Sequence, residues 1–141
     1  RMLSYSFASG QALAEVMGEG WLALADPDHV PAGIYAMSSL KFLNQWSGLS
    51  RRVARAANAR AALALVVRKE ARAGIVYETD MLGEKRVNAV DFLPAGSYPD
   101  IRYMVAALNQ ADAPGIGEYL EFLTSPSVTS ILTEFGFRPS K

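Results

Sequence analysis

Residues 26–36 read "DPDHVPAGIYA", and the first half of this segment contains residue types that could bind a metal ion. Asp26, Asp28 and His29 offer carboxylate and imidazole ligands within four positions. A zinc or non-haem iron site usually needs further ligands, and the chain contains no second histidine. The same acids can make turn and cap hydrogen bonds instead. Both interpretations remain open, and the missing second histidine favours the turn.

The second half of the segment suggests anion chemistry. Residues 21–26, "WLALAD", are mostly apolar and end in Asp-Pro, which predicts a buried strand that enters a loop. Pro31 suits the first turn of a helix, and the first free amides of that helix would belong to Ala32 and Gly33. Unpaired N–H groups and the positive end of the helix dipole attract anions. Small side chains here would let a ligand approach the backbone.

A second helix start repeats this arrangement. Asn58 predicts an N-cap, and the small residues Ala59 and Ala61 follow in the first helical turn. The apolar stretch "GIVY", residues 74–77, then ends in Tyr77, whose hydroxyl can donate a hydrogen bond. Open α/β sheets bind ligands at the carboxyl ends of their strands, so the two helix starts and Tyr77 are predicted to converge. Arg60 could bias the local field towards anions, although its position favours a surface ion pair.

Other chemistry finds less support. The absence of cysteine rules out disulfides, zinc–thiolate sites and thiol nucleophiles. There is no Gly-x-Ser-x-Gly elbow, and "GEGWLAL" and "PGIGEYL" match neither a phosphate-binding loop nor a dinucleotide fingerprint. An enzyme acting on phosphate-like substrates would need a base and a charge clamp around Tyr77, and neither is apparent. A net charge of zero gives no reason to expect a nucleic-acid partner.

The chain has 141 residues, of which half are apolar, enough for a domain with a real core. Strands are predicted at residues 2–8, 21–26, 74–77, 86–93 and 101–108, and helices in residues 9–20, from Pro31, after Asn58, and around residues 116–123 and 126–135. "SGLSRRVARA", residues 47–56, is predicted to be a polar connection. This alternation predicts an α/β three-layer sandwich with a mostly parallel sheet. No apolar run approaches the roughly 20 residues of a membrane-spanning helix. The opening "RMLSYSF" suggests a mature or truncated product.

Three segments together resemble a known family. "DPDHVPAGIYA", "ARAALALVVRKEARAGIVY" and "SPSVTSILTEFGF" are similar, in order and spacing, to the periplasmic molybdate-binding proteins of ABC importers. These are type II solute-binding proteins, and the resemblance runs from about Trp21 to Phe137. It implies a lobe that contributes to a cleft closing on molybdate or tungstate. The implied oxyanion donors are the amides of Ala32 and Ala59 and the hydroxyl of Tyr77, with no cofactor and no metal bound directly.

The chain also departs from the family pattern. The family often has valine where Ala59 stands, and commonly Tyr-Pro-Val where this chain has Tyr103-Met104-Val105. The resemblance implies that residues 1–100 form the second ligand-binding lobe with an entering hinge strand, and that residues 101–141 form a returning hinge strand and C-terminal helices. The family's first lobe, which supplies further hydroxyl donors, would precede "RMLSYSF". Because the last helices would pack on that lobe, we expect this chain to form a homo-oligomer or to exchange its C-terminal segment.

Three functions are therefore compared. The first is a solute-binding component of an ABC importer, exported to the periplasm or anchored outside the cell by lipid, with the membrane permease as its partner. The second is the ligand-sensing domain of a transcription regulator, which would predict a helix-turn-helix upstream of this segment. The third is a binder of another tetrahedral oxyanion such as sulfate. Size is the basis for choosing between anions, because molybdate and tungstate are larger than sulfate.

Overall fold

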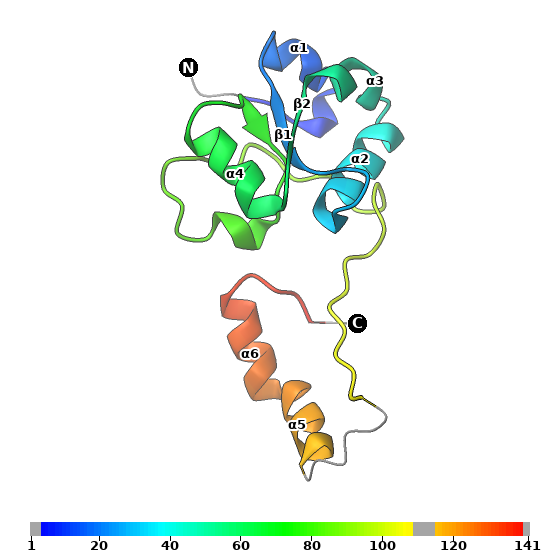
Figure 1. The fold of residues 1–141 in the computed structure, drawn as a ribbon, viewed down its shortest axis with the longest axis vertical. Coiled ribbons are helices and arrows are strands. Elements are labelled where there is room, and N and C mark those ends of the chain that lie inside the picture. The colour runs from blue at the N-terminus through cyan, green and yellow to red at the C-terminus, as the bar shows by residue number, and fades with distance from the viewer. Residues whose placement is uncertain (1–3, 109–114, 140–141) are drawn as a thin grey trace. The chain divides into compact units, whose positions relative to one another are not determined.

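The computed structural model describes residues 4–108 and 115–139 (Figure 1). The chain divides into two compact units, Arg1–Asp100 and Ile101–Lys141, which we describe separately. The assignment of these ranges as a ligand-binding lobe and a hinge with C-terminal helices stays a prediction. No helix in the described residues is both long and apolar enough to cross a membrane.

The first unit is built around a parallel sheet of three strands with the order β2-β1-β3. Strand β1 is central: Leu22 pairs with Val53 of β2 and with Ala73 of β3. The elements in chain order are η1 (Phe7–Ser9), α1 (Leu13–Met17), β1 (Leu22–Ala25), α2 (Pro31–Phe42), α3 (Trp46–Leu49), η2 (Ser50–Arg52), β2 (Val53–Ala56), α4 (Ala59–Val67), β3 (Ala73–Gly74) and η3 (Glu78–Met81). The predicted α/β class with a parallel sheet is confirmed.

The two faces of β1 carry side chains of different size. Leu22 and Leu24 are fully buried on one face, within a cluster contributed by α1, α2 and α3. Ala23 and Ala25 are fully buried on the other face, where α4 and the first turn of α2 approach. Figure 1 shows α4 on one side of the strands and α1, α2 and α3 towards the other. Helices thus cover both faces of the strand, as the three-layer prediction requires.

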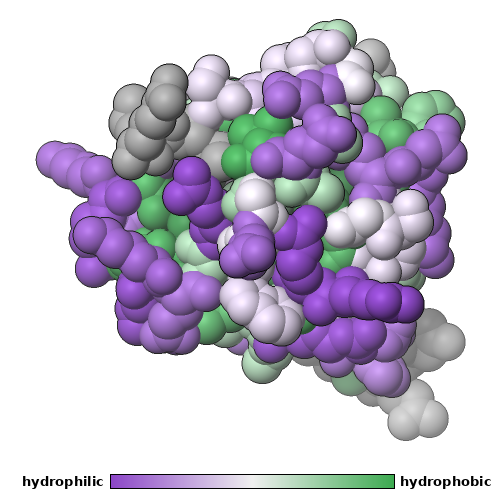
Figure 2. Space-filling view, turned by 90° about the horizontal axis from the view of Figure 1, so that it is seen from above, coloured by the Kyte–Doolittle hydropathy of each residue, from purple (hydrophilic) through white to green (hydrophobic). Residues whose placement is uncertain are grey.

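The surface of this unit is mixed in character. The face drawn in Figure 2 carries hydrophilic side chains across most of its area, with hydrophobic ones between them. A fifth of the chain's residues are charged, which is consistent with a largely hydrophilic face.

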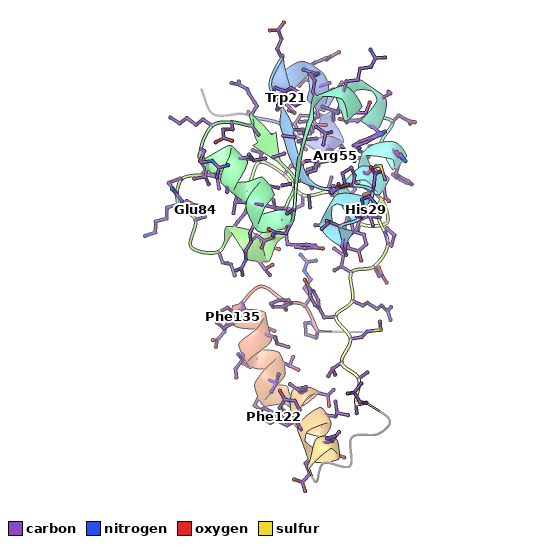
Figure 3. All side chains as sticks on the ribbon, in the orientation of Figure 1. Trp21, His29, Arg55, Glu84, Phe122 and Phe135 are labelled. Carbon is purple, nitrogen blue, oxygen red and sulfur yellow. The ribbon has the colours of Figure 1, made fainter. Side chains whose placement is uncertain are left out.

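The described residues of the second unit form two helices, α5 (Ile116–Leu123) and α6 (Pro126–Glu134), as predicted. Ser125 caps α6, because its Oγ accepts a hydrogen bond from the amide of Val128, and Pro126 occupies the first turn. Gly136 follows α6 with a positive φ of 82°, a conformation that suits glycine at a helix end. Large apolar side chains stay exposed on both helices, and Figure 3 labels Phe122 and Phe135 among them.

Three predicted strands are wrong. Residues 4–6 and 86–93 have no regular structure, and Phe7–Ser9 forms a 3-10 turn capped by Ser6; Met2 and Leu3 lie outside the described residues. Residues 101–108 also form no strand, and Met104 is 92% exposed. A strand needs a neighbour to satisfy its backbone, and alternating apolar residues do not guarantee one. In the N-terminal region the carboxylate of Asp91 accepts a hydrogen bond from the amide of Phe7 instead.

Sequence reasoning also missed β2 and misplaced β3. Val53–Ala56 lies inside the segment predicted to be a polar connection. The arginines of that segment, Arg51, Arg52 and Arg55, made it look polar, and the edge strand that pairs with β1 was missed. Strand β3 begins at Ala73, one residue before the predicted start, and its regular pairing with β1 ends at Gly74. The chain still follows β1 beyond this point, since the amide of Ile75 donates to the carbonyl of Ala23. The strand therefore ends three residues before Tyr77, where the prediction had placed its end.

Candidate anion site

The residues predicted to bind an anion meet at the carboxyl end of β1. Ala25, Ala32 and Ala59 form one buried cluster, and Tyr77 packs against it. Ala32 and Ala59 are buried, with only 8% and 7% of each residue exposed. The structure thus brings together three positions that are 27 and 18 residues apart in sequence (32 to 59, and 59 to 77). Their role as oxyanion donors stays a prediction.

The start of α2 is held directly against the end of β1. The amide of Val30 donates to the carbonyl of Asp26 at 2.9 Å, and Pro31 then begins the helix. A Cβ added to Gly33 would lie 2.1 Å from the carbonyl oxygen of Ala25, a distance no side chain tolerates. Gly33 therefore permits the close approach of helix and strand, a role that the sequence interpretation had assigned to ligand access. Among the described residues, the amides of Ala32 and Gly33 have no hydrogen-bond acceptor.

The start of α4 is set by Asn58. Its backbone is extended, its Oδ1 accepts from the amide of Ala61 at 2.8 Å, and its carbonyl accepts from Ala62. This predicted cap is confirmed. It satisfies later amides of the first turn, whereas the amides of Ala59 and Arg60 have no acceptor within the part of the chain that the structure describes. Two helix starts, from α2 and α4, thus bring unpaired N–H groups to one edge of the sheet.

Tyr77 is held by the turn that follows it. The amide of Tyr77 donates to Oδ2 of Asp80 at 3.3 Å, and the amide of Asp80 donates to the carbonyl of Tyr77 at 3.1 Å. Asp80 also forms an ion pair with Arg60, whose Nε lies 3.5 Å from Oδ1. The surface ion pair expected for Arg60 is therefore present. The sequence interpretation did not identify its partner, Asp80, although a Tyr-x-x-Asp spacing of capping-box type was a signal that could have found it.

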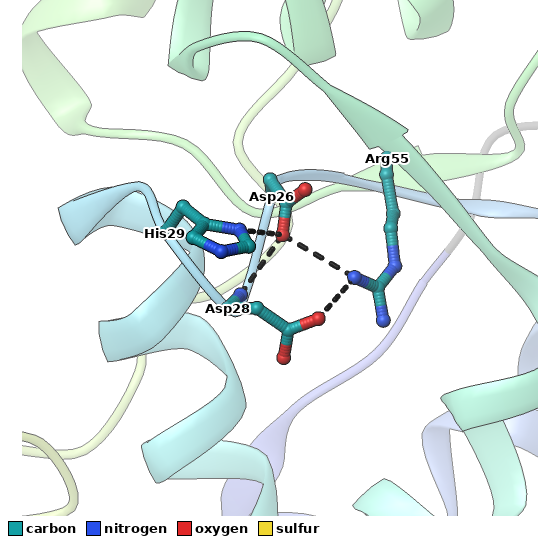
Figure 4. A network of polar contacts seen from close by, with 4 residues as sticks. All are labelled: Asp26, Asp28, His29 and Arg55. Carbon is teal, nitrogen blue, oxygen red and sulfur yellow. Dashed lines mark hydrogen bonds and ion pairs between the residues drawn. The ribbon is translucent and has the colours of Figure 1, made fainter.

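The charged residues of "DPDHVPAGIYA" form a network at the surface (Figures 3 and 4). Oδ1 of Asp26 accepts from the amide of Asp28 at 2.9 Å and from Nη1 of Arg55 at 3.3 Å. It also lies 3.7 Å from Nδ1 of His29. Arg55 hydrogen-bonds to Asp28, which lowers the pKa of the Asp28 carboxyl and raises the pKa of Arg55. These acids shape the turn before α2, as one of the two sequence interpretations predicted.

The alternative metal interpretation gains no support from this geometry. In residues 4–108 and 115–139, no three His, Cys, Asp or Glu side chains come close enough to hold a metal ion. Arg55 brings a positive charge to the two acids, which disfavours a cation between them.

Comparison with known proteins identifies the class. The family described as "Bacterial extracellular solute-binding protein" matches residues 8–138, so the chain belongs to this family. A solved structure, the periplasmic molybdate-binding protein of Azotobacter vinelandii, superposes with a TM-score of 0.72. It is 18% identical in sequence, and the match covers 93% of this chain and 60% of that one. At this identity the likeness establishes the fold.

Curated relatives narrow the comparison. The molybdate-binding protein ModA of Escherichia coli (strain K12) is 38% identical over 122 residues, which cover 86% of this chain and 48% of ModA. The Haemophilus influenzae protein of the same name is 37% identical over 134 residues, which cover 95% of this chain and 52% of that protein. A putative ABC transporter substrate-binding lipoprotein of Bacillus subtilis, YvgL, is 31% identical over 117 residues, 82% of this chain and 45% of YvgL. The chain spans about half the length of these relatives.

Proposed function

We propose that this chain supplies part of the oxyanion site of a solute-binding protein that delivers molybdate or tungstate to an ABC importer. The observation that carries the proposal is the meeting of Ala32, Ala59 and Tyr77 around Ala25 at the carboxyl end of β1. The names of the Escherichia coli and Haemophilus influenzae relatives support the choice of ligand. The function is transport of a solute, and no covalent chemistry on the ligand is proposed.

The proposed donors are all neutral. The amides of Ala32 and Ala59 and the hydroxyl of Tyr77 would each donate to an oxygen of the dianion, and the two helix dipoles would add favourable potential. Fixed backbone donors cannot follow a smaller ion inward, so they favour the larger molybdate and tungstate over sulfate. The remaining donors would come from a second lobe of the full-length protein. The 141-residue chain alone should therefore bind more weakly than the full-length gene product.

The family and the Bacillus subtilis lipoprotein support a location outside the cytoplasmic membrane. We propose the periplasm, or the outer side of the membrane with a lipid anchor, and a membrane permease as the partner. The regulator alternative makes a different prediction about the gene. An export signal encoded upstream of this segment would support the transport proposal. A DNA-binding helix-turn-helix there would instead support a ligand-sensing domain of a transcription regulator.

Calorimetry on the full-length gene product tests the choice of ligand. Molybdate and tungstate should bind more tightly than sulfate, and tighter binding of sulfate would refute the assignment. The decisive variant is Ala59→Pro, which deletes one proposed donor. Proline is well tolerated at the first position of a helix, and Asn58 before it is already extended. Loss of a hydrogen bond to a charged group should weaken molybdate binding roughly ten- to a hundred-fold.

Ala59→Val is the matched control for this experiment. Valine has a side chain of similar bulk to proline but keeps the amide, so its effect on molybdate affinity should be much smaller. Equal losses for the two variants would mean that the site responds to volume, and the proposed backbone donor at Ala59 would be wrong.

We also propose that the exposed apolar side chains of α5 and α6 are covered by protein, and that the 141-residue chain on its own forms a dimer or exchanges its C-terminal segment. Exposed apolar surface of this kind, including Tyr119, Phe122, Ile131 and Phe135, supports association. Sedimentation of the chain at micromolar concentration should show a species with twice the mass of one chain, which is 15.3 kDa. A monomer would contradict the proposal.

A further inference from the structure

We propose that Asp80 is a positioning residue that restrains Arg60 beside the anion site, so that the site selects its ligand by fixed dipoles and not by a mobile positive charge. This inference rests on the proposed function, because it concerns the same three donors. It assigns a role to a carboxylate beside a site for anions, where a free carboxylate would otherwise repel the ligand.

The two oxygens of the Asp80 carboxylate face different partners. Oδ1 lies 3.5 Å from Nε of Arg60, and Oδ2 accepts from the amide of Tyr77 at 3.3 Å. One side chain therefore links the first turn of α4, next to the proposed donor Ala59, to the residue that carries the proposed hydroxyl donor. The carboxylate is enclosed, with 11% of its side chain exposed, so its position is well defined.

Arg60 differs from Asp80 in its freedom. Its side chain is 88% exposed, and it belongs to the first turn of α4, where the helix dipole disfavours a positive charge. An ion pair this exposed contributes little to stability, because solvent screens it and the long side chain loses entropy. What the pair does control is the location of the charge. Without Asp80, a flexible guanidinium one residue from Ala59 would be available to any oxyanion that reached the site.

A free guanidinium would change the kind of selection. Backbone amides at the ends of two helices are fixed in space, so they discriminate between anions by size. Arginine instead presents five donors on a flexible stem that can follow a smaller ion, and it attracts all dianions alike. Attraction between solvent-exposed charges also weakens with salt, whereas buried dipoles respond much less. Asp80 therefore keeps ligand binding selective and nearly independent of salt.

The test uses Asp80→Asn, Arg60→Gln and the double variant in the full-length gene product. Asparagine has the same shape and keeps an oxygen that can accept from the Tyr77 amide, so it removes only the charge. Titrations with sulfate and with molybdate at about 20 mM and about 200 mM sodium chloride measure affinity and its salt dependence. We expect Asp80→Asn to bind sulfate about tenfold more tightly at low salt, with most of this gain lost at high salt.

The double variant decides whether Arg60 is responsible. Removing the guanidinium as well should return sulfate affinity and salt dependence to those of the parent protein. Persistence of the gain in the double variant, or its absence from Asp80→Asn, would overturn the inference. A purely structural role for Asp80 would lower the affinity for every anion and leave the salt dependence unchanged, which also overturns it.

These outcomes separate the inference from the proposed function. A parent protein that prefers molybdate, combined with an unchanged Asp80→Asn variant, refutes the inference alone. A parent protein that fails to bind molybdate, combined with a salt-dependent and Arg60-dependent gain in sulfate binding, refutes the molybdate assignment and supports the role of Asp80. Failure of every variant to bind either anion refutes both.

Discussion

The first unit encloses a core of fully buried apolar side chains, although Phe42 and Phe92 remain exposed on it, whereas α5 and α6 leave almost all of theirs in contact with solvent. Leu22 and Leu24 in β1 have no exposed area, and helices pack on both sides of the strand. On α5 no residue is buried, and on α6 only Val128 is. The contrast teaches that the first unit contains its own core, while the second carries amphipathic helices whose apolar faces require another surface.

Truncation of a core side chain should have the largest effect on the free energy of unfolding, and the size of this effect should differ between the two units. Leu24→Ala deletes a fully buried side chain from the central strand, so it should reduce the free energy of unfolding of the first unit by about 2–5 kcal/mol. Ile131→Ala, at a residue 52% exposed on α6, should cost less than about 1 kcal/mol at concentrations low enough to keep the chain monomeric.

Urea unfolding followed by tryptophan fluorescence measures the first effect, because both tryptophans, Trp21 and Trp46, belong to the first unit. Similar costs for Leu24→Ala and Ile131→Ala would show that Ile131 is covered in solution. That result would remove the contrast between the units and would support association through α6.

Substitution of glycine by alanine should lower the stability of the first unit at Gly33 and raise the stability of α5 at Gly117. Gly33→Ala places a methyl group against the carbonyl oxygens of Ala25 and Asp26, so α2 must shift, at a cost of about 2–3 kcal/mol and with weaker anion binding. Gly117→Ala in α5 meets nothing within 4 Å in the single chain, and in the monomeric chain it should stabilise its helix by about 0.5–1 kcal/mol. Thermal unfolding followed by circular dichroism reports both variants. Destabilisation by Gly117→Ala would mean that α5 has a close neighbour in solution.

The same contrast explains how much of the fold the sequence predicts. Local signals located three of the helices, because Pro31, Asn58 and Ser125 begin α2, α4 and α6 as expected. The short helix α3 was missed, since it lies mostly within the segment predicted to be a polar connection. Strands were less predictable because a strand exists only with a partner from elsewhere in the chain. Val53–Ala56 has such a partner in β1 although it contains Arg55, and residues 86–93 form no strand despite their apolar alternation.

The candidate site divides in a similar way. Ala32, Ala59 and Tyr77 could be proposed from local signals, namely two helix starts and an apolar segment that ends in tyrosine, together with a family resemblance over most of the chain. The spacing from Tyr77 could indicate the turn contact of Asp80 but not its proposed role, since that role depends on Arg60, which lies 20 residues earlier and meets Asp80 only in the folded chain. The roles that sequence reasoning misses are those defined by contacts between distant segments.

The smallest expected effect concerns the ion pair between Glu84 and Arg86, whose strength should not depend on the core of the first unit. Hydrogen bonds from Arg86 to Glu84 lower the pKa of this carboxyl from 4.5 to about 2. A lowered carboxyl pKa stabilises the folded chain above pH 4.5, and this contribution is lost as the pH falls towards 2. Carboxyl NMR should give a midpoint near 2 for Glu84, and Arg86→Gln should return it towards 4.5. Because the partners are two residues apart, Leu24→Ala should leave this midpoint almost unchanged while the first unit remains folded. A parallel rise in the Leu24→Ala variant would show that the core, and not the local sequence, holds the pair.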